Sequence, residues 1–298
     1  DCTSWCSILP VPCVKGKKKG VLAMNIKLLV ENLEFSYQSV PVLSGMCMDV
    51  PKGSLVSILG PNGSGKSTFL KCVDRILKPQ KGVILIDSED VLSLGRMNLA
   101  KKISYVPQSS VRVFPHSVFD VILMGRRPHL GWMGSDYDED RVWDVIELLG
   151  LEDIANHSFN ELSGGQQQKV LIARALVQDT ELMLLDEPTS NLDIWHQLDV
   201  MRIVAELVSR QGITALMAVH DLNMASRYSD RIILMKDGIV HASGMPNEVL
   251  TEENIADVYG VKADVHVKED GIPVIIPYQQ IMGGEFKRVA VGNGITVT

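Results

Sequence analysis

Short apolar runs and helical patterns follow one another along most of this chain. The run Ser54–Leu59 is compact and apolar, and Gly60 follows it at once. Such a run is typical of a strand buried inside a parallel sheet. The same part of the chain predicts further strands and one helix. We expect strands at Ile26–Val30, Leu33–Tyr37, Val42–Val50 and Gly82–Asp87, and a helix at Lys66–Leu77.

The pattern becomes helical between about residues 109 and 170. Within this stretch, Ser117–Gly125 and Asp138–Gly150 are the candidate helices. The second helix places four apolar residues on one face, and that spacing is more often a core stripe than a binding surface. These residues are Val142, Val145, Ile146 and Leu149.

Strand-like and helical segments alternate again in the second half of the chain, and this alternation favours an α/β fold with a largely parallel sheet. We therefore predict an α/β core with a mostly parallel sheet, an N-terminal antiparallel β subdomain and an inserted α-helical subdomain. The expected segments are strands at Leu182–Leu185, Ile213–Val219, Arg231–Met235 and Val274–Ile276, and helices at Gln197–Arg210 and Glu252–Tyr259.

The two ends of the chain carry little pattern. Residues 1–23 show no periodicity, and Met24 is a candidate natural start. We treat this leader as a tail and expect the main domain over residues 24–265, with the helical subdomain at about 109–170. Residues 266–298 are expected to form a C-terminal extension.

Composition and charge exclude several classes of protein. The chain has 298 residues, 46% of them hydrophobic, with a formal net charge of −7. Because there is no general basic character, we expect no nucleic-acid partner. No apolar stretch approaches the ~20 residues needed to cross a bilayer. Cys47 and Cys72 lie in a predicted strand and helix, where buried reduced thiols and a cytoplasmic setting are expected.

The segment after the first buried strand satisfies the pattern G-x4-G-K-[ST]. It lies between a strand and a helix, where its glycines let backbone N–H groups close around phosphates. The helix N-terminus adds its positive dipole end. Lys66 would reach the β- and γ-phosphates of ATP, and the Ser67 hydroxyl would bind Mg²⁺. The residues expected to contact the nucleotide are Gly60, Pro61, Asn62, Gly63, Ser64, Gly65, Lys66, Ser67 and Thr68.

A second acidic element follows the strand Leu182–Leu185. Asp186 and Glu187 stand where the chain leaves the sheet, beside the crevice in which such folds bind ligands. Asp186 would hold Mg²⁺, and Glu187 would accept a proton from an attacking water. An acidic pair before a proline can also cap a turn, but beside a phosphate loop the metal site is the better interpretation.

The segment Leu162–Gln166, twenty residues before Asp186, looks like the signature motif of the ATP-binding subunits of ABC transporters. The chain resembles these subunits over roughly Met24–Gln280. A serine and two glycines would open a helix whose N-terminus suits an anion. In the family, two subunits pack head to tail, and each signature faces the partner's γ-phosphate. The resemblance therefore implies that a second copy completes the site with Ser163, Gly164, Gly165 and Gln166.

Further positions match this family. Tyr37 matches the aromatic residue that stacks on adenine, and Gln108 matches the glutamine that contacts Mg²⁺ and the attacking water. His220 matches the switch histidine that contacts the γ-phosphate. Ser190–Asp193 matches the loop that touches the opposite subunit. A lone tyrosine or histidine is more often structural, so the resemblance carries these roles.

Two positions depart from the family pattern. Gln167 and Lys169 stand where family members often carry arginines. This difference leaves ATP binding intact but puts in doubt any contact at that helix that requires an arginine.

The resemblance narrows to importers of iron chelates, haem and cobalamin at Met124–His129 and Leu192–Leu198. It implies an ATP-hydrolysing subunit at the cytoplasmic face of the cell membrane. Its partners would be membrane-spanning permease subunits and, indirectly, a substrate-binding protein. We expect the surface at roughly Ser109–Gly125 to dock the permease. Arg126 and Arg127 either belong to that surface or form a solvated basic turn.

Two other classes remain open. One is an ABC ATPase not coupled to transport, but such proteins carry a long coiled coil or a second cassette, and neither pattern is present. The other is a partner subunit that binds ATP only to dimerise. Such subunits typically lose the carboxylate or the switch histidine, whereas Glu187 and His220 are both present. The transported cargo is not encoded in any residue of this chain that we can identify.

Overall fold

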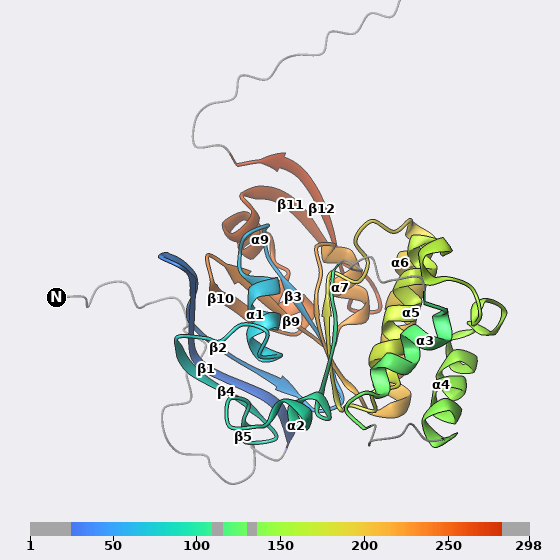
Figure 1. Ribbon diagram of the computed structural model, residues 1–298. Helices are drawn as coiled ribbons and strands as arrows, with labels where there is room; N and C mark the ends of the chain where they lie inside the picture. Colours follow the sequence, from blue (N-terminus) through green and yellow to red (C-terminus); the bar gives the residue numbers. More distant parts are fainter. Residues whose placement is uncertain (1–24, 109–115, 130–135, 282–298) are drawn as a thin grey trace, which may run out of the picture.

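The computed structural model describes residues 25–108, 116–129 and 136–281 (Figure 1). A six-stranded sheet lies at its centre. Its strands are β3 (Leu55–Leu59), β6 (Ile103–Val106), β7 (Leu182–Asp186), β8 (Thr214–Ala218), β9 (Arg231–Lys236) and β10 (Ile239–Gly244). They lie in the order β10-β9-β3-β8-β7-β6, and every neighbouring pair is parallel except β9 and β10.

The central strands separate two hydrophobic cores. Successive side chains of a strand point to opposite faces, so Leu55 and Leu59 enter one core while Val56 and Ile58 enter the other. β3, β7 and β8 are buried along their whole length. This explains why their sequences are continuous apolar runs, as expected for parallel strands covered on both faces.

An antiparallel sheet covers one of these cores. Its order is β2-β1-β4-β5, and its strands are β1 (Ile26–Tyr37), β2 (Val40–Pro51), β4 (Lys81–Ile86) and β5 (Glu89–Asp90). The sequence predicted two strands in this region, but β1 is continuous. The register of its pairing with β2 shifts between Val30 and Leu33, at the place where the two strands were separated. Helix α1 (Lys66–Val73) packs into the same core and is shorter than predicted. Arg75, with a φ of 57°, turns the chain out of the helix.

The other core lies under a group of helices (Figure 1). These helices are α3 (Val118–Leu123), α4 (Asp136–Leu149), α5 (Gly164–Leu176) and α6 (Ile194–Gln211). The four apolar residues predicted as a stripe on α4 are all buried here, which confirms that they are core residues. Short elements complete the described chain: α2 (Arg96–Ala100), α7 (Leu222–Tyr228), α8 (Pro246–Val249), α9 (Glu252–Tyr259), β11 (Val261–Val267) and β12 (Pro273–Gln280).

The predicted fold class is confirmed: a mostly parallel α/β core, an antiparallel β layer and a helical region. The domain limits stay predictions, and β11 runs across residue 265. The leader and the last residues lie outside the described ranges. No helix within those ranges is long and apolar enough to cross a bilayer. Cys72 is buried, whereas Cys47 is only partly buried, so the prediction of burial is wrong for Cys47.

Candidate active site

The loop between β3 and α1 has the backbone of a phosphate cradle. Gly60, Gly63 and Gly65 take φ angles of 153°, 80° and 100°, which other residues rarely adopt. At Gly60 a side chain would also have no room, because a Cβ atom would lie 2.3 Å from the carbonyl oxygen of Met235. The loop therefore depends on glycine at this position for both conformation and close packing.

Lys66 is the first residue of α1 and is 4% exposed. Its ammonium group donates to the carbonyl oxygens of Gly60 at 2.8 Å and Pro61 at 3.1 Å. Burial lowers the pKa of Lys66, and the carboxylates of Glu187 and Asp186 oppose that shift. An ammonium has three donors, so this lysine can bind a phosphate oxygen while it holds the loop.

Asp186, at the end of β7, contacts both neighbouring elements of the site. Its Oδ1 accepts a hydrogen bond from Ser67 Oγ at 2.7 Å, and its Oδ2 accepts one from the Tyr105 hydroxyl at 3.0 Å. Burial, with the Asp186 charge, raises the pKa of Tyr105. A hydroxyl and a carboxylate, with the Gln108 amide nearby, offer the hard oxygen ligands that Mg²⁺ prefers. The residues present therefore fit this metal.

Glu187 is held between two polar side chains. Gln108 Nε2 donates to its Oε2 at 2.5 Å, and His220 Nε2 lies 2.5 Å from its Oε1. These residues follow the carboxyl ends of β6, β7 and β8, which are neighbours in the sheet. Parallel strands end at the same edge, and ligands bind outside that edge. The structure thus brings together three predicted site residues that are distant in the sequence.

The backbone at Glu187 is unusual for a residue with a side chain. Its φ is 50°, in the left-handed region that costs a non-glycine residue of order 1–3 kcal/mol. Its N–H donates to the Ala218 carbonyl at 3.0 Å, and its carbonyl accepts from Ser190 Oγ at 2.9 Å. The surrounding structure therefore fixes the direction of the Glu187 side chain.

A cavity of about 310 Å³ joins these parts. It extends from Tyr37, past the phosphate loop, to Glu187. The Tyr37 ring is 47% exposed, and its edge-to-face contact with Phe35, at 4.9 Å between ring centres, orients it. Among the described residues that line this cavity, none belongs to the segment Ser163–Gln166.

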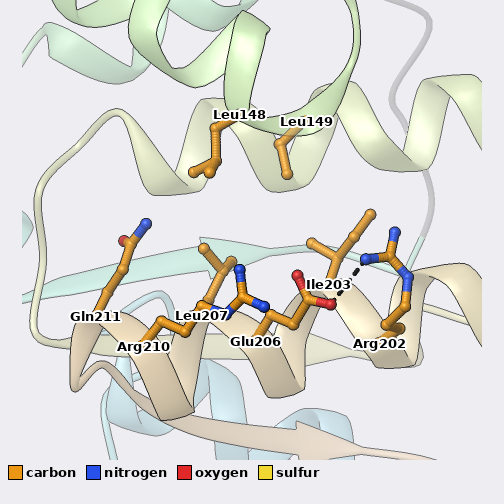
Figure 2. Close-up of a pocket in the computed structure, with 8 residues that line it drawn as sticks. All are labelled: Leu148, Leu149, Arg202, Ile203, Glu206, Leu207, Arg210 and Gln211. Atoms are coloured by element: carbon orange, nitrogen blue, oxygen red, sulfur yellow. Dashed lines mark hydrogen bonds and ion pairs between the residues drawn. The ribbon is translucent and has the colours of Figure 1, made fainter.

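A second pocket lies between α4 and α6, and no residue of the phosphate loop lines it. Figure 2 shows Leu148 and Leu149 above Arg202, Glu206 and other residues of α6. It holds only about 80 Å³, below the size of ordinary ligand sites. The cavity at the phosphate loop, which Lys66 and Ser67 line, is the candidate for a nucleotide.

The predicted signature segment starts α5. Ser163 caps the helix, because its Oγ accepts from Gln166 N at 3.3 Å while Gln166 Oε1 accepts from Ser163 N at 3.0 Å. Gly165 packs against α6 so closely that a Cβ atom would lie 1.9 Å from His196 Cδ2. Gly164 is exposed, with its nearest such contact at 3.7 Å. The helix N-terminus therefore presents backbone and small side chains to its surroundings.

The two positions that lack arginines have local structural contacts. Gln167 Nε2 donates to the carbonyl oxygens of Phe159 and Leu162, each at 3.2 Å. Lys169 Nζ lies 2.6 Å from Asp199 Oδ2. These contacts hold the turn before α5 and connect α5 to α6.

Arg126 is not a surface residue, so both sequence interpretations of it are wrong. It is 3% exposed, and its Nε donates to Asp138 Oδ1 at 2.8 Å while its Nη1 donates to Asp179 Oδ2 at 2.5 Å. A guanidinium can be buried when such partners satisfy its donors. Arg127 is exposed. The first part of the predicted docking segment, residues 109–115, lies outside the described residues.

Comparison with known proteins identifies the family. The sequence profile described as "ABC transporter" matches residues 43–190. An ABC transporter ATP-binding protein of Methanocaldococcus jannaschii is 49% identical over 255 residues, which are 85% of this chain and 99% of that protein. The chain belongs to the ABC transporter family.

Other relatives of this ABC ATPase have named roles. A petrobactin import ATP-binding protein of Bacillus anthracis is 34% identical over 86% of this chain and 94% of its own length. The ferric enterobactin transport ATP-binding protein of Escherichia coli is 34% identical over 84% of this chain and 94% of its own.

Solved structures agree with this assignment. An inward-facing ABC transporter of the metal-chelate type has a TM-score of 0.75 and 30% identity, over 85% of this chain and 98% of that one. A dimeric bacterial ABC transporter cassette has a TM-score of 0.66 and 33% identity, over 74% and 98%. The ABC ATPase described here therefore binds ATP and hydrolyses it.

Proposed function

We propose that this ABC ATPase hydrolyses ATP with Glu187 as the group that orients and deprotonates the attacking water. The observation that carries the proposal is the contact of Glu187 with both Gln108 and His220 at one end of the nucleotide cavity. Lys66 and the loop Gly60–Thr68 hold the phosphates, and the Tyr37 ring supports the adenine. A general base of this kind contributes about 10²–10⁴-fold to a rate.

Ser67, Asp186 and Gln108 would hold Mg²⁺. When bound, this ion neutralises charge on the β- and γ-phosphates. Asp186 directs one oxygen toward Ser67, and Gln108 connects the same region to Glu187. No described group of three or more His, Cys, Asp or Glu side chains forms a separate metal cage. Mg²⁺ is usually bound by one or two carboxylates together with substrate phosphates.

A second copy of the chain would complete the site with its Ser163–Gln166, a segment that does not line the nucleotide cavity of its own chain. The exposed start of α5 would face the γ-phosphate bound by the partner. The dimeric cassette among the similar structures supports this arrangement. Closure of the dimer would assemble the catalytic groups, and opening would release ADP and phosphate.

The ATPase would power import of an iron chelate, haem or cobalamin at the cytoplasmic face of the cell membrane. Relatives named for petrobactin and cobalamin import support this cargo class. A permease would dock near the exposed Arg127, beside a cavity of about 650 Å³ that Met124 and Arg174 also line. The test is co-purification with a permease from membranes, followed by uptake assays with Arg127→Glu. Unchanged permease binding and uptake in that variant would contradict the docking site.

A further inference from the structure

Tyr105 connects the candidate metal site to the large cavity at the edge of the helical region. Its hydroxyl donates to Asp186 Oδ2 at 3.0 Å, while Asp186 Oδ1 accepts from Ser67. The same residue lines the cavity of about 650 Å³. We propose that Tyr105 is a positioning residue for metal binding, which holds the Asp186 carboxylate so that its second oxygen faces Ser67. This inference rests on the proposed metal site.

The carboxylate of an aspartate side chain has rotational freedom that its neighbours can remove. A carboxylate can rotate about its terminal bond, because rotation about an sp³–sp² bond is broad. The Asp186 side chain is 2% exposed, and hydrogen bonds to its two oxygens from opposite partners remove that freedom. Groups that orient a metal ligand in this way typically affect metal affinity by 10–100-fold.

The chemical nature of the residue that contacts Asp186 matters as much as its position. A lysine or arginine in place of Tyr105 would neutralise the negative charge of Asp186, which a bound Mg²⁺ requires. A phenol donates one hydrogen bond to Asp186 and carries no charge of its own. The carboxylate is thus oriented without being neutralised.

The ring and the hydroxyl of Tyr105 have separable roles. The ring packs against the core between the central sheet and the antiparallel sheet. The hydroxyl contacts Asp186, a residue 81 positions away in the sequence. Phenylalanine keeps the ring and removes only the hydrogen bond, so Tyr105→Phe isolates the proposed function. Tyr278→Phe, which removes an exposed hydroxyl on β12, is the matched control.

The experiment measures ATP binding by isothermal titration, with and without Mg²⁺, in full chains that carry Glu187→Gln to prevent turnover. We expect Tyr105→Phe to leave ATP affinity without Mg²⁺ unchanged. The Mg²⁺ concentration that gives half of the metal-dependent gain should rise roughly tenfold. Tyr278→Phe should match the parent. For each variant, ATP binding with Mg²⁺ is compared with ATP binding without Mg²⁺, so a general loss of stability affects both measurements equally.

Two results would overturn the inference and can be told apart. If the parent and Tyr105→Phe require the same Mg²⁺ concentration, Tyr105 does not position Asp186, and the proposed metal site is unaffected. If the Glu187→Gln parent itself shows no effect of Mg²⁺ on ATP binding, the metal site fails and the role of Tyr105 fails with it.

Discussion

His220 Nε2 lies 2.5 Å from Glu187 Oε1, although the two residues follow different strands, β8 and β7. The backbone of Glu187 is also bound to β8, through its N–H and the carbonyl of Ala218. Side chain and backbone are therefore tied to the same neighbouring strand. A displacement of the β8 end would move the proposed base and the histidine together.

Replacing Glu187 tests its proposed role as the base. Glutamine keeps the size and one oxygen acceptor but cannot accept the proton. We expect Glu187→Gln to lower the ATPase rate by about 10²-fold or more, with ATP affinity retained. Steady-state phosphate release and nucleotide binding provide the measurement. The control is Glu253→Gln on the exposed surface of α9. Equal turnover in the Glu187 variant and the control would remove Glu187 from the mechanism.

The two signature glycines give a matched pair for stability. An alanine at Gly165 would bring its Cβ atom within 1.9 Å of the His196 ring, so the ring or one of the helices α5 and α6 must shift. We expect Gly165→Ala to destabilise the protein by about 1–3 kcal/mol, as overpacking generally does. Gly164→Ala, where the nearest contact is 3.7 Å, should be close to neutral. Denaturant unfolding measures both, and equal stabilities would show that this helix contact is not tight.

Replacing the neighbouring residues Arg126 and Arg127 should change the stability of the protein by very different amounts. Arg126→Ala removes an ion pair in which both side chains, Arg126 and Asp138, are buried, and breaking such a pair costs about 3–5 kcal/mol. Arg127→Ala changes an exposed side chain and should alter stability by less than about 0.5 kcal/mol. Thermal or denaturant unfolding of the two variants decides the point. A stable Arg126→Ala chain would mean that the ion pair is dispensable.

Asp74 should make stability depend on pH. Burial raises its pKa from 3.8 to about 7, so between these values the folded chain holds a proton that the unfolded chain has released. Stability contributed by the protonated form is therefore lost as pH rises through this window. Relative to wild type, Asp74→Asn should gain at most about 2–3 kcal/mol between pH 5 and pH 8.

Unfolding curves at both pH values test the Asp74 prediction. Asp257→Asn, on the exposed side of α9, provides the control and should show no such gain. A constant difference between Asp74→Asn and wild type at pH 5 and pH 8 would show that Asp74 titrates as an ordinary surface carboxyl.

The parts of this protein that sequence predicted are those with local signals. Glycines and a lysine between a strand and a helix specify the phosphate loop within a few residues. Asp186 and Glu187 follow directly from the apolar run of β7. The roles of Tyr37 at the adenine and of His220 as the switch histidine could be predicted only from the family resemblance, because a lone tyrosine or histidine carries no local pattern.

The parts that sequence missed depend on long-range contacts or on very short elements. β6 has four residues and was not predicted, so Tyr105 was not recognised beside Asp186. Arg126 is followed by a basic residue, like a surface turn, and its burial follows from Asp138 and Asp179, which are distant in the sequence. Contacts of this kind become visible only when the elements are packed.

ATP-dependent dimerisation tests most directly whether a second copy of the chain completes the nucleotide site. We expect Glu187→Gln to be a dimer by light scattering with Mg²⁺ and ATP, and a monomer without ATP. Adding Gly164→Glu places a negative charge where the exposed signature would meet the partner's γ-phosphate. That double variant should still bind ATP but stay monomeric. A dimer of the double variant, or a monomer of Glu187→Gln saturated with ATP, would contradict the claim.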